Sequence, residues 1–99
     1  MMNLLTRAAC PDDRRFIFST WLLSSRAYLK RITWEQRREV VEALLGACTC
    51  LVVCPKDDPD IILGWSAWLG GTMMWVYVQK DARGNGIARR LADAAYRQG

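Results

Sequence analysis

The chain has 99 residues, 52% of them hydrophobic, so it is long enough for one small core and too short for two domains. The net charge of +4 suits an anionic ligand but does not by itself indicate nucleic acid. Charges interrupt every apolar run, and the N-terminus lacks the pattern of a secretory signal. We therefore expect a single domain over residues 1–99 in a cytoplasmic protein, with no membrane or nucleic-acid partner.

The first predicted elements are a strand and a helix. Residues 3–8 are predicted to form a short strand with two leucines as its apolar part. Pro11 and the two aspartates after it favour the start of a helix, because proline presets φ and acidic residues suit the first turn. Apolar residues at helical spacing extend this helix to about Tyr28.

A second helix is predicted from its capping residues. Thr33, with Gln36 three residues later, forms a capping box. The helix then continues through Leu45, and Gly46 is its expected C-cap. Its apolar face is expected to contain Trp34, Val40, Val41, Leu44 and Leu45. Its charged residues fit a solvated face with ion pairs, and they are Glu35, Arg37, Arg38, Glu39 and Glu42.

Three strands are predicted after the helices. Residues 49–53 are rich in β-branched and apolar side chains. A polar turn leads to the next strand over residues 61–69, in which Gly64 marks a bulge or a close backbone approach. A glycine pair joins this strand to residues 72–78, so the two form a hairpin.

The most informative segment is the glycine-rich loop between the last strand and a final helix over residues 86–96. Gly84 and Gly86 can adopt positive φ, which lets the chain curl around a ligand. The first amide groups of the helix have no partner within the helix, and the helix dipole adds positive potential. Arg83 adds a full positive charge. The loop therefore predicts a site for a phosphorylated cofactor.

The order β-α-α-β-β-β-α, with this loop before the last helix, resembles the GNAT superfamily of acyl-CoA-dependent N-acyltransferases. The signature of that family is Arg or Gln, two residues, Gly, one residue, then Gly or Ala. Arg83, Gly86 and Ala88 occupy the three defining positions. The resemblance implies an α/β (α+β) fold with helices packed on a mostly antiparallel sheet. It covers nearly the whole chain as the N-terminal portion of the family, ending before the fifth strand.

The resemblance implies transfer of an acetyl or other acyl group from acetyl-CoA, or another acyl-CoA, to an amine on a small molecule or protein. The pantetheine arm would bond the backbone of the last strand, and the loop amides would hold the pyrophosphate. The implied cofactor-binding residues are Val76, Tyr77, Val78, Arg83, Gly84, Asn85, Gly86, Ile87 and Ala88. No catalytic residue is assigned, because the last strand has no carboxylate to act as general base.

The missing carboxylate and the absence of the family's later segments leave a second function open. Family members commonly supply a tyrosine as general acid from a later segment, whereas Tyr96 fits a packing or surface role. The strand over residues 72–78 would be a sheet edge, with Trp65, Trp68 and Trp75 uncovered. The alternative is a catalytically weak or inactive module that binds CoA or a protein, and whose exposed edge pairs with a partner or a second copy.

The four cysteines, Cys10, Cys48, Cys50 and Cys54, are interpreted as reduced apolar residues in or near the core. A metal site is not expected, because the chain has no histidine and no Cys-x-x-Cys pair. The basic connection between the first two helices borders the acceptor pocket in the family. We interpret it as a solvated loop rather than a site for an acidic acceptor.

Overall fold

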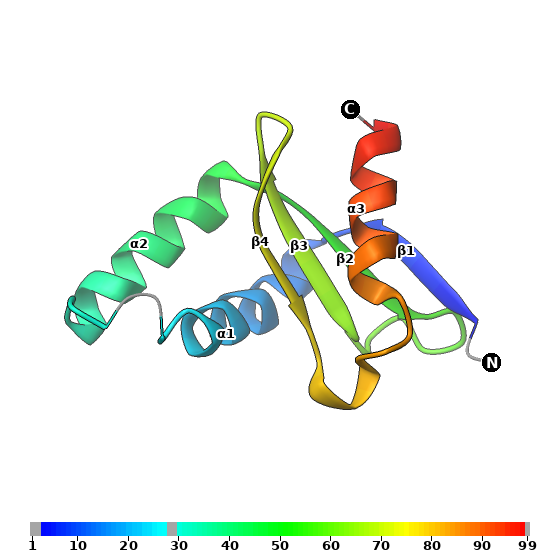
Figure 1. Cartoon of the computed structure of the whole chain (residues 1–99), viewed down its shortest axis with the longest axis horizontal. Coiled ribbons are helices and arrows are strands. Elements are labelled where there is room, and N and C mark those ends of the chain that lie inside the picture. The colour runs from blue at the N-terminus through cyan, green and yellow to red at the C-terminus, as the bar shows by residue number, and fades with distance from the viewer. Residues whose placement is uncertain (1–2, 28–29, 99) are drawn as a thin grey trace.

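The chain forms one antiparallel sheet with helices on both faces. The computed structural model describes residues 3–27 and 30–98, with the backbone alone for residues 95–98. The strands are β1 (Leu4–Ala8), β2 (Thr49–Pro55), β3 (Gly64–Leu69) and β4 (Thr72–Val78), in the order β1-β2-β3-β4. The helices are α1 (Arg14–Ser24), α2 (Trp34–Ala47) and α3 (Ile87–Gln98), and Pro11–Asp13 and Lys80–Ala82 form short 3-10 turns. The predicted element order and the α+β class are confirmed (Figure 1).

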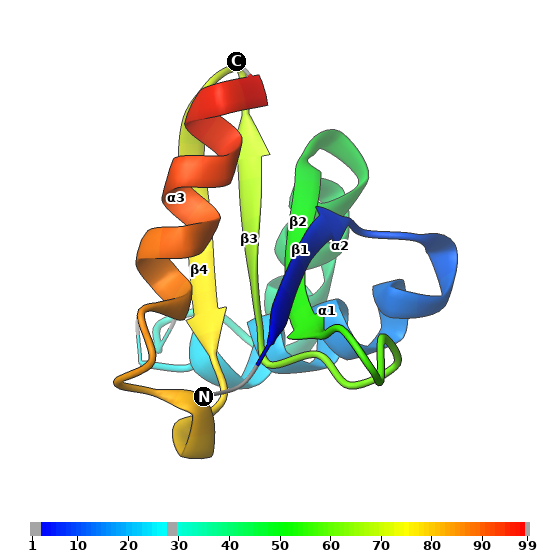
Figure 2. The ribbon, with the colours of Figure 1, turned by 90° about the vertical axis from the view of Figure 1, so that its right-hand side faces the viewer.

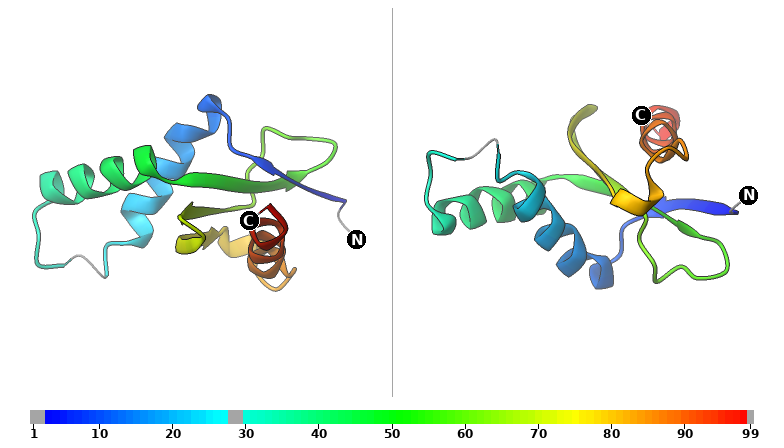
Figure 3. Two further views of the ribbon diagram at one scale, coloured as in Figure 1. Left: turned by 90° about the horizontal axis from the view of Figure 1, so that it is seen from above. Right: turned by 60° about the horizontal axis from the view of Figure 1, so that its bottom comes forward.

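The sheet separates two apolar cores. Helices α1 and α2 lie on one face of the sheet and α3 on the other (Figure 3). The core beneath α1 and α2 includes Trp21, Val52 and Trp65, and the core beneath α3 includes Val53 and Leu91. Strand β2 is buried on both faces, which explains its continuous apolar sequence, since successive side chains point to opposite faces.

Both predicted helix ends in the first half of the chain differ from the structure. Helix α1 ends at Ser24, and Tyr28 lies outside the described residues. Helix α2 continues through Gly46 to Ala47, so the predicted C-cap at Gly46 is wrong. Cys48 is the C-cap and is already extended at φ −89° and ψ 152°. The chain passes directly into β2, so this helix end needs no left-handed residue.

The buried stripe of α2 is narrower than predicted. It consists of Arg37, Val41 and Leu45, which are spaced four residues apart. Trp34 and Val40 were expected on the apolar face but are 49% and 42% exposed. Arg37 was expected in solvent but is buried, with its guanidinium carbon 5.6 Å from the centroid of the Trp34 ring. Because α2 packs mainly on α1 and extends beyond the sheet, only one row of its side chains is covered (Figure 3).

Strand β3 begins at Gly64 rather than at residue 61. The residues just before it are hydrogen-bonded but do not belong to the strand. Leu63 N donates to Val53 O of β2, and Ile62 O accepts a bond from the Gln79 side chain, which follows β4. The register shift between β3 and β4 lies at Ala67 and Trp68, so Gly64 does not mark the bulge. It marks a close approach, because a Cβ there would lie 2.8 Å from Ile87 Cγ2.

Strand β4 is an edge of the sheet in the described part of the chain, as predicted. Its exposed apolar residues are Met73, Met74 and Val76. The tryptophans are less exposed than expected. Trp65 is fully buried and its Nε1 donates to Thr20 Oγ1 at 2.8 Å, because α1 covers this face of the hairpin. Trp68 and Trp75 are half-buried.

The cysteine interpretation is confirmed in part. Cys50 and Cys54 are buried and free, and burial raises the pKa of the Cys50 thiol to about 11. Cys10 is exposed, because it precedes the turn into α1 and its thiol faces the Asp13 carboxylate. In the part of the chain that the structure describes, no group of three His, Cys, Asp or Glu side chains is placed to hold a metal ion. No helix there has the length and apolar character needed to cross a membrane.

We expect Asp13→Asn to lower the free energy of unfolding by roughly 2 kcal/mol at pH 7. The Arg7 guanidinium holds Asp13 through contacts of 2.6 and 3.1 Å, and Cys10 N donates to it at 2.8 Å. The side-chain bond from Arg7, followed by the bonds from Cys10, lowers the pKa of Asp13 from 3.8 to about 2. The carboxylate therefore stabilises the fold fully above about pH 4, and this contribution is lost as the pH falls through 2.

Urea unfolding of wild type and variant at pH 7 and pH 2 measures this contribution. The two curves should differ at pH 7 and converge at pH 2. Asp12→Asn, which changes the exposed neighbour, is the matched control and should leave the midpoint unchanged. A pH-independent difference between wild type and Asp13→Asn would contradict the ion-pair explanation.

Candidate functional site

The loop between β4 and α3 has the backbone shape that the sequence predicted. Gly84 and Gly86 adopt φ values of +87° and +72°, which side chains with a Cβ rarely adopt. The side chain of Asn85 closes the loop, because its Nδ2 donates to Ala82 O at 2.9 Å. Ile87 is buried against β2 and β3 in the core beneath α3 and anchors the start of the helix to the sheet.

The amide groups of this loop are available to a ligand. Within the described residues, the amide nitrogens of residues 84–88 donate to no acceptor. The first backbone bond that returns to the loop is from Arg90 N to Gly86 O, at 3.0 Å. Gly84, Asn85, Gly86 and Ala88 are exposed. Five consecutive amide donors therefore have no protein acceptor at the positive end of the α3 dipole, and four of these five residues are exposed. Such an arrangement binds phosphate groups.

Strand β4, which ends just before this loop, has an edge that pairs with no other strand in the described part of the chain. Gln79 N donates to Leu63 O, so these two residues form a hydrogen-bonded pair. Such pairs recur at every second residue of an antiparallel ladder, so Tyr77 and Trp75 of β4 also bond β3. Bonding alternates along an antiparallel pair, so the main-chain groups of Val76 and Val78 point away from β3. Val78 O accepts a bond from Arg83 Nε at 3.3 Å, as expected for an outward carbonyl. The edge can pair with an extended ligand.

The comparisons with known proteins agree on the fold. A possible acetyltransferase from Clostridium difficile 630 superposes with a TM-score of 0.73 at 17% identity, over 97% of this chain and 70% of its own. A GCN5-related N-acetyltransferase from Rhodopseudomonas palustris superposes with a TM-score of 0.67 at 17% identity, over 99% of this chain and 67% of its own. The chain has the GNAT fold.

A third GNAT-fold structure is the aminoglycoside N-acetyltransferase AAC(6′)-Iy in complex with CoA. It matches at a TM-score of 0.57 and 13% identity, over 100% of this chain and 70% of that enzyme. The chain thus spans about two thirds of the length of these GNAT structures. No protein-family profile and no curated protein sequence matches this chain. At these identities, structural similarity establishes the fold alone.

The GNAT fold brings the predicted cofactor residues together as two adjoining groups. One is the loop of residues 83–88, and the other is the end of β4 at Val76, Tyr77 and Val78. Arg83 is exposed, but its side chain folds back onto Val78 O, so it lies between the two groups. The bond from Asn85 to Ala82 O was not foreseen. The preference of Asn for bonding nearby backbone is the signal that predicts it.

Among the described residues beside β4, we assign no general base. Strand β4 carries no carboxylate, and the side chain of Tyr96 lies outside what the structure describes. On the face of β4 toward α1, Tyr77 contacts Phe16 edge-on at 6.3 Å between ring centroids. Trp75 is fixed there by its Nε1, which donates to Ser24 Oγ at 2.9 Å. Half-buried aromatic rings therefore line this face.

The basic connection after α1 borders a hollow in the surface. A cavity of about 510 Å³ is lined by Leu23, Ser24, Arg26, Ala27 and Lys30. Arg26 and Lys30 are exposed, in agreement with a solvated loop. Among the described residues that line it, this hollow offers positive charge but no buried polar side chain to bind an acceptor.

Proposed function

We propose that this chain binds acetyl-CoA or another acyl-CoA and transfers the acyl group to an amine. The observation that carries the proposal is the row of unbonded amides over residues 84–88, which adjoins the outward backbone of Val76 and Val78. The amides would bind the pyrophosphate, and the β4 edge would pair with the amides of the pantetheine arm. The pyrophosphate and the pantetheine arm thus each have a main-chain partner of matching chemistry.

The reaction would depend mainly on orientation. Pairing along β4 fixes the thioester beside the strand, where the acceptor nitrogen attacks its carbonyl carbon. The new C–N bond forms as the C–S bond breaks, and CoA leaves as a thiolate. The nitrogen loses a proton to solvent and the thiolate gains one, since β4 offers no carboxylate to relay them. An outward amide of β4 can polarise the thioester oxygen.

Two measurements on the wild-type chain test this proposal. Isothermal titration with acetyl-CoA should give one site per chain, with a dissociation constant at or below about 100 μM, as for typical enzyme substrates. A thiol-release assay with a panel of amines should then show turnover that rises with pH through the pKa of the amine. Absence of binding would overturn the proposal.

The alternative is a module that binds CoA without efficient catalysis, or that binds a protein through β4. The exposure of Met73, Met74 and Val76 along an open edge favours it. Binding of acetyl-CoA without thiol release from any amine would support this alternative. A mass measurement in solution then tells whether a second copy pairs with the edge.

A further inference from the structure

A cavity of about 400 Å³ lies between the start of α1 and the middle of α2. Its volume is in the range of small-molecule sites. Pro11 and the half-buried Phe18 form an apolar part of its wall. Three positive side chains and one negative side chain give it a formal charge of +2, and they are Arg14, Arg15, Arg38 and Glu42. The cavity therefore combines an excess of positive charge with an apolar wall.

The three arginines of this cavity are not neutralised by the protein. All three are exposed, and within the described residues none of their guanidinium groups donates a hydrogen bond or lies in an ion pair. Asp13, the carboxylate next to Arg14 in the sequence, holds Arg7 instead, through contacts of 2.6 and 3.1 Å. Guanidinium groups bind phosphate through paired N–H groups, so three of them around one cavity favour a dianionic ligand.

A second cavity, of about 380 Å³, adjoins the first on the side of the start of β2. The two cavities share Pro11 and Arg14 as lining residues. Among the described residues, Arg14 is the one charged side chain of the second lining, which otherwise contains mainly apolar side chains and thiols, such as Ile17, Leu45, Cys48 and Cys50. Burial raises the pKa of the Cys50 thiol to about 11, and the charge of Arg14 acts on this thiol in the opposite direction. The second cavity can therefore hold an apolar group beside the guanidinium of Arg14.

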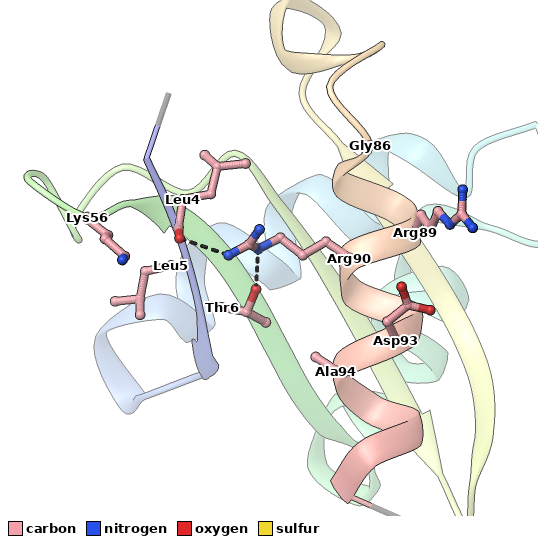
Figure 4. A pocket seen from close by; sticks show the side chains of 9 residues that line it. All are labelled: Leu4, Leu5, Thr6, Lys56, Gly86, Arg89, Arg90, Asp93 and Ala94. Atoms are coloured by element: carbon pink, nitrogen blue, oxygen red, sulfur yellow. Dashed lines mark hydrogen bonds between the residues drawn. The ribbon is translucent and has the colours of Figure 1, made fainter. Parts of the chain in front are cut away.

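These two cavities are separate from a larger one that adjoins the proposed cofactor loop. The larger cavity, of about 630 Å³, lies beside β1, between the start of that strand and the first turns of α3, and Gly86 lines it (Figure 4). There Arg90 is bonded to β1, because its Nε donates to Thr6 Oγ1 at 2.8 Å and its Nη2 to Leu4 O at 2.9 Å. The start of α1 lies on the opposite side of the molecule from α3 (Figure 2). A ligand at the three arginines of α1 and α2 therefore leaves the loop free.

We propose that the two adjoining cavities together bind a small organic phosphate. The three arginines hold the phosphate, and the cavity lined by Cys48 and Cys50 takes the apolar part of the molecule. A phosphomonoester carries a charge of about −1.5 to −2 at pH 7, which matches the +2 of the first cavity. Helices α1 and α2 pack against each other, so their guanidinium groups can contact the same phosphate. The apolar part gains free energy because it leaves water.

Isothermal titration of the whole chain with hexyl phosphate, inorganic phosphate and hexanoate tests the proposal. Hexyl phosphate should bind at least about tenfold more tightly than inorganic phosphate, because its alkyl chain is buried. It should also bind more tightly than hexanoate, because a dianion interacts more strongly with the arginines. Arg15→Gln and Arg38→Gln should each weaken the binding of hexyl phosphate by about fivefold or more.

Two control variants separate this site from general charge and from the cofactor loop. Arg31→Gln removes an exposed positive charge that lines neither cavity, so it should leave the affinity for hexyl phosphate unchanged. Gly86→Glu places a carboxylate in the loop on the other face of the sheet, so it should also leave this affinity unchanged.

Alkylation of Cys48 by iodoacetamide locates the apolar part of the ligand. Cys48 is half-buried and lines the second cavity, so saturating hexyl phosphate should slow its modification about fivefold, whereas saturating inorganic phosphate should not. The inference is wrong if hexyl phosphate binds no more tightly than inorganic phosphate or hexanoate, or if Cys48 is not protected. It is also wrong if both Arg15→Gln and Arg38→Gln bind as wild type does, or if either control variant loses as much affinity as they do. These outcomes leave the proposed acyl-CoA site untouched.

Discussion

Gly84→Glu and Gly86→Glu are each expected to weaken CoA binding at least about a hundredfold. A carboxylate in the loop repels the pyrophosphate and occupies its place beside the amides of residues 84–88. A Cβ meets no atom within 4 Å at either glycine, so packing does not oppose the change. The measurement is isothermal titration with CoA, together with urea unfolding of each variant.

Gly71→Glu controls for backbone strain. Gly71 has φ +82°, close to the +87° of Gly84, and it also has open space around its Cβ position. It lies in the turn between β3 and β4, at the far end of the hairpin from the loop. Its replacement should cost the same stability, of order 1–2 kcal/mol, and should leave CoA affinity unchanged. If the loop variants bind CoA as well as Gly71→Glu does, the loop is only a turn.

Gly64→Ala is expected to lower the free energy of unfolding by about 1–3 kcal/mol. Its Cβ would lie 2.9 Å from Tyr77 O and 2.8 Å from Ile87 Cγ2. To make room, the buried Ile87 side chain must change rotamer or lift the start of α3, and Tyr77 O can move only with the backbone of β4. Movement of α3 or β4 disturbs the proposed cofactor site, so CoA affinity should fall as well.

Gly46→Ala is the same substitution with the opposite expected sign. Gly46 lies inside α2, is exposed and has nothing within 4 Å of its Cβ position. Alanine should therefore raise the free energy of unfolding by about 0.5–1 kcal/mol through helix propensity. Urea midpoints that move in the same direction for both variants would contradict the close approach at Gly64.

The sequence predicted those parts of the structure whose signals are local. The capping box of Thr33 and Gln36 forms as expected, with bonds of 2.9 and 3.1 Å. Positive φ at Gly84 and Gly86 also followed from glycine itself. These features depend on neighbours within a few residues, so periodicity and residue type suffice to find them.

The errors arose where distant segments decide burial. Trp34 and Arg37 exchanged their expected environments, because the packing of α2 on α1 covers only one stripe. Trp65 was expected at an open surface but lies under α1. The bonds from Arg90 to β1 join residues more than 80 positions apart, and no pattern along the chain predicts them. The cavity beside β1 was therefore not foreseen.

The same bonds leave the two margins of the sheet unequal. On β1, arginine side chains bond two main-chain carbonyls, those of Leu4 and Ala8. On β4, among the described residues, an arginine side chain bonds one carbonyl, that of Val78 at the end of the strand. Strand addition needs free main-chain groups, so a newcomer strand can join at β4 but meets guanidinium groups at β1. Any pairing of two copies through β4 would close on itself as a twofold assembly and offer no template for a growing fibril.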